Sequence, residues 1–350
     1  MILEQWGFVV KLRIRVGIVG ATGLVGKTLV QILENRNWCD EIMLFASEKS
    51  KGKTMLFRGN RLPVRPLTEE NVLFSCQIVF FAATGELSKK LAPLLTSQKI
   101  VVIDKSATWR LDPNVPLVIP EINADALYKH RGIIASPNCT TTGVVMALAP
   151  IHELNPLKSV KVVTLQAASG AGEKGMEELE LQRKNSLNCP VVFPDFLEDN
   201  VIPQCEMFFG SNDEITTEEI KLAQETRKIL SAPDIDITAL CVRVPVSVGH
   251  SAAMCFTATE DIHVDKIWLS LVNFPGLCYT TNPLATPFMA RGKDKVYVSR
   301  LRSVPARNVI YSNYSKTFWL WSVIDNIRKG AATNAAQIAE YLIDKKLLFR

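Results

Sequence analysis

The N-terminal region carries the stretch RVGIVGATGLVG at residues 15–26. Its first part, Arg15–Gly20, is rich in β-branched side chains and predicts a short strand, and Leu24–Asn35 has the apolar periodicity of a helix. The turn between them has the spacing G-x-x-G-x-x-G, a variant of the dinucleotide-binding fingerprint, at Gly20, Gly23 and Gly26. Strand, glycine turn and helix in this order predict a site where a pyrophosphate approaches the backbone at a helix N-terminus.

The residues that follow alternate between apolar strands and helices up to residue 138. A helix is predicted at Ser88–Leu95, and buried strands are predicted at Glu41–Ala46, Ile78–Ala82 and Ile100–Ile103. Continuously apolar strands that alternate with helices are typical of a parallel sheet covered on both faces. We therefore expect residues 1–138 to form an α/β, doubly wound, Rossmann-type domain that binds a nucleotide.

Beyond about residue 151 the strands become longer and alternate between apolar and polar residues. Strands are predicted at Val160–Gln166, Ile237–Val246, Ala252–Thr259 and Lys295–Leu301, and helices at Thr217–Leu230 and Phe318–Lys346. Such strands suit a mixed sheet with one face packed by helices, and hence an α+β architecture. We expect a second domain at residues 139–325, and a C-terminal helix at residues 326–350 that packs back onto the first domain.

The composition is that of an ordinary globular protein. The 350 residues are 47% hydrophobic and 21% charged, and the net charge of +5 is spread along the chain. This argues against a nucleic-acid-binding protein and is compatible with small anionic substrates. The eight cysteines form no CxxC pairs, and no apolar run approaches the roughly 18 residues of a membrane span. With no secretory signal, we expect a cytoplasmic protein with free thiols, no metal site and no membrane contact.

A second motif, SPNCTTTG at residues 136–143, places a cysteine between a Pro-Asn turn and a helix start. If the helix begins at Thr140, the thiol of Cys139 faces unpaired N–H groups and the positive end of the helix dipole. Both favour a thiolate at neutral pH, and a thiolate suits the role of a nucleophile. The alternative is a buried structural cysteine, which is the ordinary state of a free thiol.

The loop after the second predicted strand, ASEKSKGK at residues 46–53, is where an adenine ribose is expected. Glu48 can accept a hydrogen bond from a free 2′-hydroxyl group, which would favour NAD. Ser47, Lys49 and Ser50, with two further lysines, offer donors and positive charge for a 2′-phosphate, which favours NADP. A solvated loop without a ligand is the remaining alternative.

Three more segments accompany these motifs: DKSATWR at residues 104–110, QAASGAG at residues 166–172 and CVRVPVSVGH at residues 241–250. With DNIRKGAA at residues 325–332, they closely resemble aspartate-β-semialdehyde dehydrogenase, in the same order over nearly the whole chain. The resemblance implies reduction of L-4-aspartyl phosphate by NADPH to L-aspartate 4-semialdehyde and phosphate, through a cysteine thioester. It also implies a role in the biosynthesis of lysine (through diaminopimelate), threonine and methionine. It further implies that residues 139–325 form a catalytic and dimerisation domain, so that the protein is a homodimer, with a tetramer of paired dimers as the alternative.

The resemblance gives each matching residue of this chain a role. Cys139 matches the nucleophile, His250 the general acid/base and Gln166 the group that orients the thioester. The residues that match substrate contacts are Arg243 for the carboxylate, Glu218 for the ammonium, Arg110 and Lys221 for the phosphate, and Asn138 beside the cysteine. The residues that match cofactor contacts are Gly20, Thr22, Gly23, Leu24, Val25, Ser47, Lys49, Ser50, Ser169, Gly170 and Asn326.

Several alternatives remain open at this point. Glu218 and Lys221 are neighbours on a predicted helix, but their spacing alone favours an exposed salt bridge. Lys49 stands where the family commonly carries arginine, so it offers a point charge in place of a bidentate fork. The competing functions are N-acetyl-γ-glutamyl-phosphate reductase, which shares the glycine turn and the Ser-Gly-Ala-Gly stretch, and a non-catalytic NADPH-binding sensor.

Overall fold

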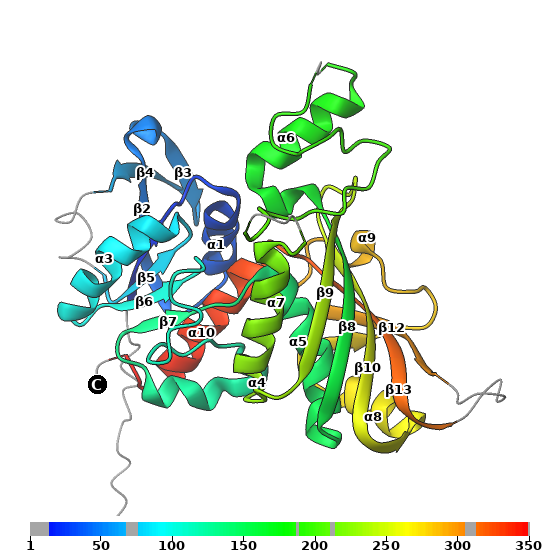
Figure 1. The fold of residues 1–350 in the computed structure, drawn as a ribbon. Coiled ribbons are helices and arrows are strands. Elements are labelled where there is room, and N and C mark those ends of the chain that lie inside the picture. The colour runs from blue at the N-terminus through cyan, green and yellow to red at the C-terminus, as the bar shows by residue number, and fades with distance from the viewer. Residues whose placement is uncertain (1–13, 68–75, 187–188, 211–213, 305–312, 349–350) are drawn as a thin grey trace, which may run out of the picture.

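The computed structural model describes residues 14–67, 76–186, 189–210, 214–304 and 313–348. The chain forms two sheets that lie next to each other, with the C-terminal helix between them (Figure 1). The first sheet has the order β3-β4-β2-β1-β5-β6-β7, and all its neighbouring strands are parallel except β3 and β4. Its strands are β1 (Ile14–Val19), β2 (Cys39–Ala46), β3 (Thr54–Phe57), β4 (Asn60–Pro66), β5 (Ile78–Phe81), β6 (Val101–Asp104) and β7 (Ile133–Ala135).

Helices cover both faces of this sheet. Residues of α1 (Leu24–Glu34) and α10 (Thr333–Asp344) share one apolar cluster with β1, β2 and β5, whereas α3 (Gly85–Ser97) packs on the other face. Short helical segments at α4 (Pro120–Asn123) and Ala124–Lys129 precede β7. The expected doubly wound, Rossmann-type sheet is confirmed, although the β3–β4 hairpin and β7 were not predicted.

The glycine turn between β1 and α1 depends on two residues without a side chain. Gly20 has a φ of +83°, and a Cβ there would lie 2.3 Å from the carbonyl oxygen of Ala82. A Cβ on Gly26 would lie 2.2 Å from the carbonyl oxygen of Gly20, so α1 can approach the turn only at a glycine. The end of β1 and the start of α1 are therefore packed as the dinucleotide fingerprint requires.

The second sheet is mixed, as expected, with the order β11-β12-β13-β10-β8-β9. Its parallel pairs are β8 with β9 and β11 with β12, and its other pairs are antiparallel. The strands are β8 (Leu157–Gln166), β9 (Asp236–Arg243), β10 (His250–His263), β11 (Leu277–Tyr279), β12 (Val296–Ser303) and β13 (Tyr314–Ile324). Helices α5 (Cys139–Leu154), α7 (Thr217–Ile229) and α8 (Val264–Asn273) pack into the apolar core on one face, whereas α6 (Gly172–Arg183) projects away from the sheet (Figure 1).

The helix expected at Phe318–Lys346 is wrong over its first part, because residues 314–324 form β13. Phe318 and Leu320 point into the core, while the intervening Trp319 and Trp321 lie half-buried on the other face. This alternation of large side chains with period two suits a strand, and the packing of both faces outweighs local helix propensity. Only after a π-helical turn at Arg328–Ala332 does the tail become the helix α10.

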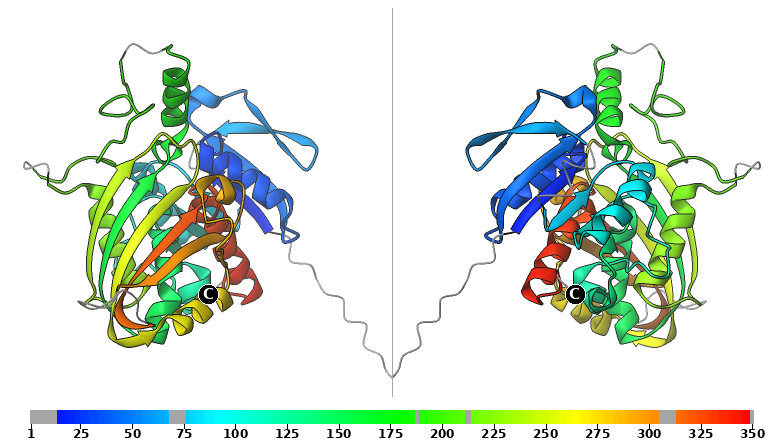
Figure 2. Two further views of the ribbon diagram at one scale, coloured as in Figure 1. Left: turned by 90° about the vertical axis from the view of Figure 1, so that its right-hand side faces the viewer. Right: turned by 90° about the vertical axis from the view of Figure 1, so that its left-hand side faces the viewer.

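The face of the second sheet opposite α5 and α8 is largely uncovered (Figure 2). Val163 and Leu240 are 39% and 48% exposed there. A cavity of about 390 Å³ on this side is lined by residues that include Leu284, Trp319 and Trp321. All eight cysteines are free thiols. Within the described parts of the chain, the helices are too short or too polar to cross a membrane.

Candidate active site

The reactive cysteine of the sequence motif opens α5. Cys139 is the first residue of the helix and Asn138 is its N-cap, whose Oδ1 accepts hydrogen bonds from the backbone N–H groups of Thr140 (2.7 Å) and Thr141 (3.2 Å). The expected helix start is confirmed, one residue earlier than Thr140. Because the Asn138 amide occupies two of the unpaired N–H groups, fewer of them face the thiol than the sequence suggested.

A cavity of about 300 Å³ joins this cysteine to the glycine turn. It is lined at one end by Leu24 and Val25 and at the other by Arg110, Asn138 and Cys139, and its wall also includes Lys105, Ser169, Gly170, Asn326 and Gly330. The two motifs, which are more than a hundred residues apart in the sequence, therefore open onto one space. The predicted groups Gln166, Glu218, Arg243 and His250 lie behind Asn138 and Gly170 rather than in the wall.

Helix α7 presents a buried carboxylate to the cysteine loop. Glu218 accepts hydrogen bonds from Asn138 Nδ2 (2.9 Å), Thr140 Oγ1 (3.2 Å) and Gln166 Nε2 (3.2 Å), and Lys221 Nζ lies 3.2 Å from it. Burial alone would raise the pKa of Glu218, but the charge of Lys221 and the donated hydrogen bonds lower it below its usual value. Glu218 is only 3% exposed, so its ion pair with Lys221 is not the exposed salt bridge that spacing alone favoured.

A second carboxylate on α7, Glu225, was not predicted as a site residue. It is fully buried and accepts hydrogen bonds from Arg110 Nη1 (2.9 Å) and from the backbone N–H of Asn138 (2.7 Å). Arg110 also donates to the carbonyl oxygens of Ser136 (3.2 Å) and Lys105 (2.6 Å). Glu225 thus holds both Arg110, the predicted phosphate ligand, and Asn138, the residue before Cys139. Helical spacing from Glu218 shows the shared face, but only the tertiary fold brings Arg110 to it.

The remaining catalytic candidates come from the ends of neighbouring strands. Gln166 ends β8, Arg243 ends β9 and His250 begins β10, with β8 between the other two. A Cβ on Gly170 would lie 2.5 Å from Arg243 Nη1 and 3.1 Å from His250 Cε1, so both side chains rest against this glycine. Alternation along one continuous strand would place Arg243 and His250 on opposite faces. The fold brings them together because they lie on separate strands, at the end of β9 and the start of β10.

Arg243 is held by two groups besides Gly170. Its Nη1 donates to the carbonyl oxygen of Ala167 (2.8 Å), and its guanidinium lies 5.9 Å from the ring centre of Phe193. The loop that carries Phe193 is fixed by Glu178 of α6, whose carboxylate accepts from the backbone N–H groups of Val191 (3.0 Å), Val192 and Phe193. Nothing in the local sequence pattern indicates this role of Phe193.

His250 is held as a neutral hydrogen-bond donor. The backbone N–H of Ala167 donates to its Nδ1 (3.0 Å), so the proton of the neutral ring lies on Nε2. Nε2 is buried and has no hydrogen-bond partner among the described residues. Burial and the neighbouring Arg243 lower the pKa of His250 to about 3. The imidazole therefore offers an N–H group at neutral pH.

The surroundings of Cys139 oppose the expected thiolate. Burial and the Glu218 carboxylate raise the pKa of Cys139, whereas Lys105, Arg110 and a hydrogen bond with Thr140 lower it, and the net direction is upward. The surroundings of Cys139 therefore do not support a free thiolate at neutral pH, because burial and Glu218 outweigh the two cations and the Thr140 hydrogen bond.

The predicted cofactor residues fall into two groups. Leu24, Val25, Ser169, Gly170 and Asn326 line the cavity, and Asn326 accepts from the backbone N–H of Gly249 (3.0 Å) and bonds Ser169 Oγ. Thr22 Oγ1 lies 3.3 Å from Ser50 Oγ, which ties the glycine turn to the loop after β2. Ser47 and Lys49 are exposed on that loop and lie outside the cavity wall.

Comparison with known proteins agrees with this geometry. The chain matches the family models for the semialdehyde dehydrogenase NAD binding domain at residues 15–130 and for the semialdehyde dehydrogenase dimerisation domain at residues 148–329. It is 42% identical over 346 residues to the aspartate-semialdehyde dehydrogenase of Aquifex aeolicus (strain VF5), across 95% of this chain and 99% of the relative. The chain belongs to the aspartate-semialdehyde dehydrogenase family. Aspartate-semialdehyde dehydrogenase 2 of Vibrio cholerae is 39% identical over 337 residues, across 94% of this chain and 97% of the relative.

A solved structure supports the same assignment. The crystal structure of aspartate semialdehyde dehydrogenase II from Vibrio cholerae complexed with ASA has a TM-score of 0.87 at 36% identity, covering 95% of this chain and 98% of that chain. The resemblance to the aspartate-semialdehyde dehydrogenase family is thus confirmed over both domains. The protein is an oxidoreductase of amino-acid biosynthesis with a nicotinamide-cofactor domain, and the comparisons favour neither competing function.

Proposed function

We propose that the protein reduces L-4-aspartyl phosphate with NADPH to L-aspartate 4-semialdehyde and phosphate, through a thioester on Cys139. The observation that carries this proposal is the single cavity that joins the glycine turn, the buried cation Arg110 and the cysteine at the start of α5. The Vibrio cholerae relative, crystallised with ASA, supports the same substrate. The reaction would serve the cytoplasmic biosynthesis of lysine, threonine and methionine.

The sulfur of Cys139 attacks the acyl carbon, the S–C bond forms, and the bond to the phosphate oxygen breaks. The first helical N–H groups have no acceptor within the helix, so the backbone N–H of Cys139 is placed to stabilise the oxyanion. The Nε2–H group of His250 is a second donor for that oxygen. Because His250 is neutral with Nε2 protonated, we assign its Nε2–H to a hydrogen bond that stabilises the oxyanion while the ring keeps its proton. The proton that the thiol of Cys139 loses ends on the departing phosphate.

Charged side chains behind Asn138 and Gly170 suit the polar groups of the substrate. We assign Glu218 to the ammonium group and Arg243 to the α-carboxylate, while Gln166 orients the thioester. Arg110 uses three of its five N–H donors on Ser136, Lys105 and Glu225, so two remain for a phosphate, which Lys221 would also bind.

The residues around the glycine turn fit a dinucleotide. The absence of Cβ atoms at Gly20 and Gly26 leaves room for a pyrophosphate at the N-terminus of α1, and Leu24 and Val25 line the cavity that leads to Cys139. A nicotinamide bound in this cavity would supply the hydride that reduces the thioester. Ser169, Gly170 and Asn326 would hold the nicotinamide end.

We propose NADP rather than NAD as the cofactor. Lys49 and Ser47 are exposed beside Ser50, and Glu48, the one group that would favour NAD, lies 3.9 Å from Lys51 in an exposed pair. The test is Lys49→Ala, which should raise the KM for NADP several-fold and leave the KM for NAD unchanged. Equal effects on both cofactors would contradict the assignment.

We further propose two domains, residues 1–138 and 139–325, with the C-terminal helix 326–350 packed on the first. Ala335, Ile338 and Leu342 of α10 belong to the apolar cluster of the first sheet. A homodimer would bury the uncovered face of the second sheet, where Val163 and Leu240 are exposed. Light scattering should give twice the chain mass, and Leu240→Glu should shift it toward a monomer.

One assay tests the reaction itself. Purified protein with NADP, phosphate and aspartate semialdehyde should form NADPH, which is followed by its absorbance at a longer wavelength than that of NADP. N-acetylglutamate semialdehyde should not support the reaction. Cys139→Ala should abolish turnover while cofactor binding survives. Absence of phosphate-dependent NADPH formation from aspartate semialdehyde would overturn the proposed reaction, and unchanged turnover in Cys139→Ala would overturn the role of the thiol.

A further inference from the structure

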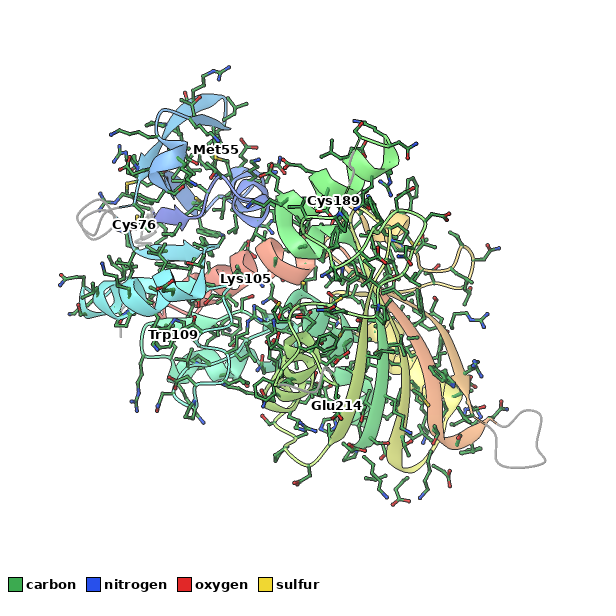
Figure 3. All side chains as sticks on the ribbon, turned by 45° about the horizontal axis from the view of Figure 1, so that its top comes forward. Met55, Cys76, Lys105, Trp109, Cys189 and Glu214 are labelled. Carbon is green, nitrogen blue, oxygen red and sulfur yellow. The ribbon has the colours of Figure 1, made fainter. Side chains whose placement is uncertain are left out.

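Lys105 is a lysine of the cavity wall to which none of the steps above gives a role. It follows β6 and lies at the centre of the molecule beside the C-terminal helical segment (Figure 3). Its Nζ donates to the carbonyl oxygens of Pro137 (2.8 Å) and Gly330 (3.2 Å) and to Ser136 Oγ (3.3 Å). These acceptors surround the nucleophile, because Pro137 is two residues before Cys139 and a Cβ on Gly330 would lie 2.9 Å from Cys139 Cβ.

All three hydrogen-bond partners of Lys105 are neutral, and it makes no ion pair in the described part of the chain. The other enclosed cations of this region differ in this respect. Arg110 pairs with Glu225 (2.9 Å) and Lys329 pairs with Glu121 (2.7 Å). An ammonium group held among neutral groups in a poorly solvated site needs an anion nearby, and the cavity wall offers the sulfur of Cys139.

We propose that the ammonium group of Lys105 is the counter-ion of the Cys139 thiolate. A thiol with a neutral amine and a thiolate with an ammonium differ only in the place of one proton, which leaves Sγ and is held at Nζ. The net charge of the cavity is the same in both states, so the reactive form carries no additional uncompensated charge. The proposal rests on Cys139 being the nucleophile.

The hydrogen bonds around Lys105 accommodate both states. The ammonium form has three donors for three acceptors. The neutral amine donates to the carbonyl groups of Pro137 and Gly330 and accepts from the hydroxyl of Ser136, whose oxygen also accepts from Asn334 Nδ2 (3.0 Å). Lys105 therefore has a partner for each of its N–H groups in both forms, which lowers the free-energy cost of moving the proton.

The burial and the charges around Lys105 make its ammonium and neutral amine forms similar in free energy near neutral pH. Burial and Arg110 lower the pKa of Lys105 to about 7, against the opposing effects of Cys139, Glu225 and Asp104. Lys105 is also the leading positive charge that lowers the pKa of Cys139, against burial and Glu218. His250 cannot accept the proton of Cys139, because its Nδ1 already accepts a hydrogen bond from the N–H of Ala167 and its Nε2 carries a proton.

The test measures the thiol directly, without substrate or cofactor, so its outcome is independent of the proposed reaction. Full-length protein is treated with iodoacetamide across a pH series, and mass spectrometry follows alkylation of the Cys139 peptide, with the exposed Cys189 as internal reference. The variants are Lys105→Met, which removes the charge and the donors, and Lys105→Gln, which keeps donors without the charge. Lys89→Gln, on the exposed side of α3, is the matched control.

We expect the pH midpoint of Cys139 alkylation to rise by about 1–3 units in both Lys105 variants and to stay unchanged in Lys89→Gln. A midpoint like that of the unmodified protein in a folded Lys105→Gln would overturn the proposal, as would a shift that occurs only in His250→Asn. Circular dichroism and the alkylation rate of Cys189 report whether each variant is folded. If Lys105→Met does not fold, the closer-sized Lys105→Gln decides alone.

Discussion

Gly170 lies against the two side chains that we assign to the substrate carboxylate and to the oxyanion, so an alanine there tests whether their positions matter. A Cβ at residue 170 would lie 2.5 Å from Arg243 Nη1 and 3.1 Å from His250 Cε1. Non-bonded heavy atoms prefer about 3.5–4 Å, so the guanidinium must retreat by about 1 Å. The backbone of Gly170 is not in the left-handed region, and alanine itself adds no backbone strain.

The expected effect of Gly170→Ala is on kinetics and not on stability. The clashing atom is the end of a flexible side chain, so we expect the free energy of unfolding to change by less than about 1 kcal/mol. However, the same Nη1 atom donates to the carbonyl of Ala167 at 2.8 Å, and the retreat moves the guanidinium away from the position that this bond sets. A misplacement of about 1 Å at a substrate-orienting group costs on the order of 100-fold in rate.

The assay is NADPH formation with aspartate semialdehyde, NADP and phosphate varied in turn. For Gly170→Ala, we expect kcat/KM for the aldehyde to fall about 100-fold, with the melting temperature and the affinity for NADP nearly unchanged. Two results would refute the reasoning: an aldehyde kcat/KM equal to that of the unmodified protein, or a loss confined to NADP. The second would show that the Cβ meets the cofactor and not the pair Arg243 and His250.

Three further changes have distinct expected outcomes. Glu225→Gln leaves one acceptor oxygen for two buried donors, Arg110 and the backbone N–H of Asn138, so the free energy of unfolding in urea should fall by about 1–3 kcal/mol. The KM for phosphate should rise because Arg110 shifts. Phe193→Leu removes the ring beside Arg243, so the KM for the aldehyde should rise several-fold at nearly constant kcat. His250 has a pKa lowered to about 3, against about 6.5 in an unfolded chain, so the unfolded state binds more protons in this window. Stability should therefore fall by about 1.4 kcal/mol per unit as the pH drops from 6.5 to 3, and urea titrations of His250→Asn should lack this slope.

The first sheet could be predicted from the sequence because its strands are buried on both faces. Such strands are continuous apolar runs, and the observed β1, β2, β5 and β6 begin and end within about two residues of the predicted ones. The segment after Phe318 was harder to predict, because the aromatic residues of β13 resemble the apolar stripe of a helix when the partner strands are unknown. Its true partners, β10 and β12, are distant in the sequence, and pairing with them decides its structure.

Apart from the roles that the family resemblance implies, the site could be predicted only where its chemistry depends on neighbours in the sequence. The start of α5 follows from the Asn cap, and the glycine turn follows from the spacing of three glycines. Lys105, Glu225 and Phe193 carry no such local signal, since a lysine after a strand or a glutamate on a helix is most often solvated. Their roles arise from partners on other elements.

The same distinction explains why the helix start does not by itself activate the thiol. A helix dipole contributes about 0.3–1 kcal/mol near its terminus, which is less than one pKa unit at 1.36 kcal/mol. A unit charge within about 4–6 Å in a poorly solvated site moves a pKa by about 1–3 units. Burial has the largest effect on the pKa of Cys139, and the charges that act beside it are Lys105 and Arg110 from the loop after β6, opposed by Glu218 of α7. Because these segments meet only in the folded chain, the reactivity of the cysteine is a property of the assembled site, and a change of one charge should alter it more than any change within the SPNCTTTG motif that preserves the cap.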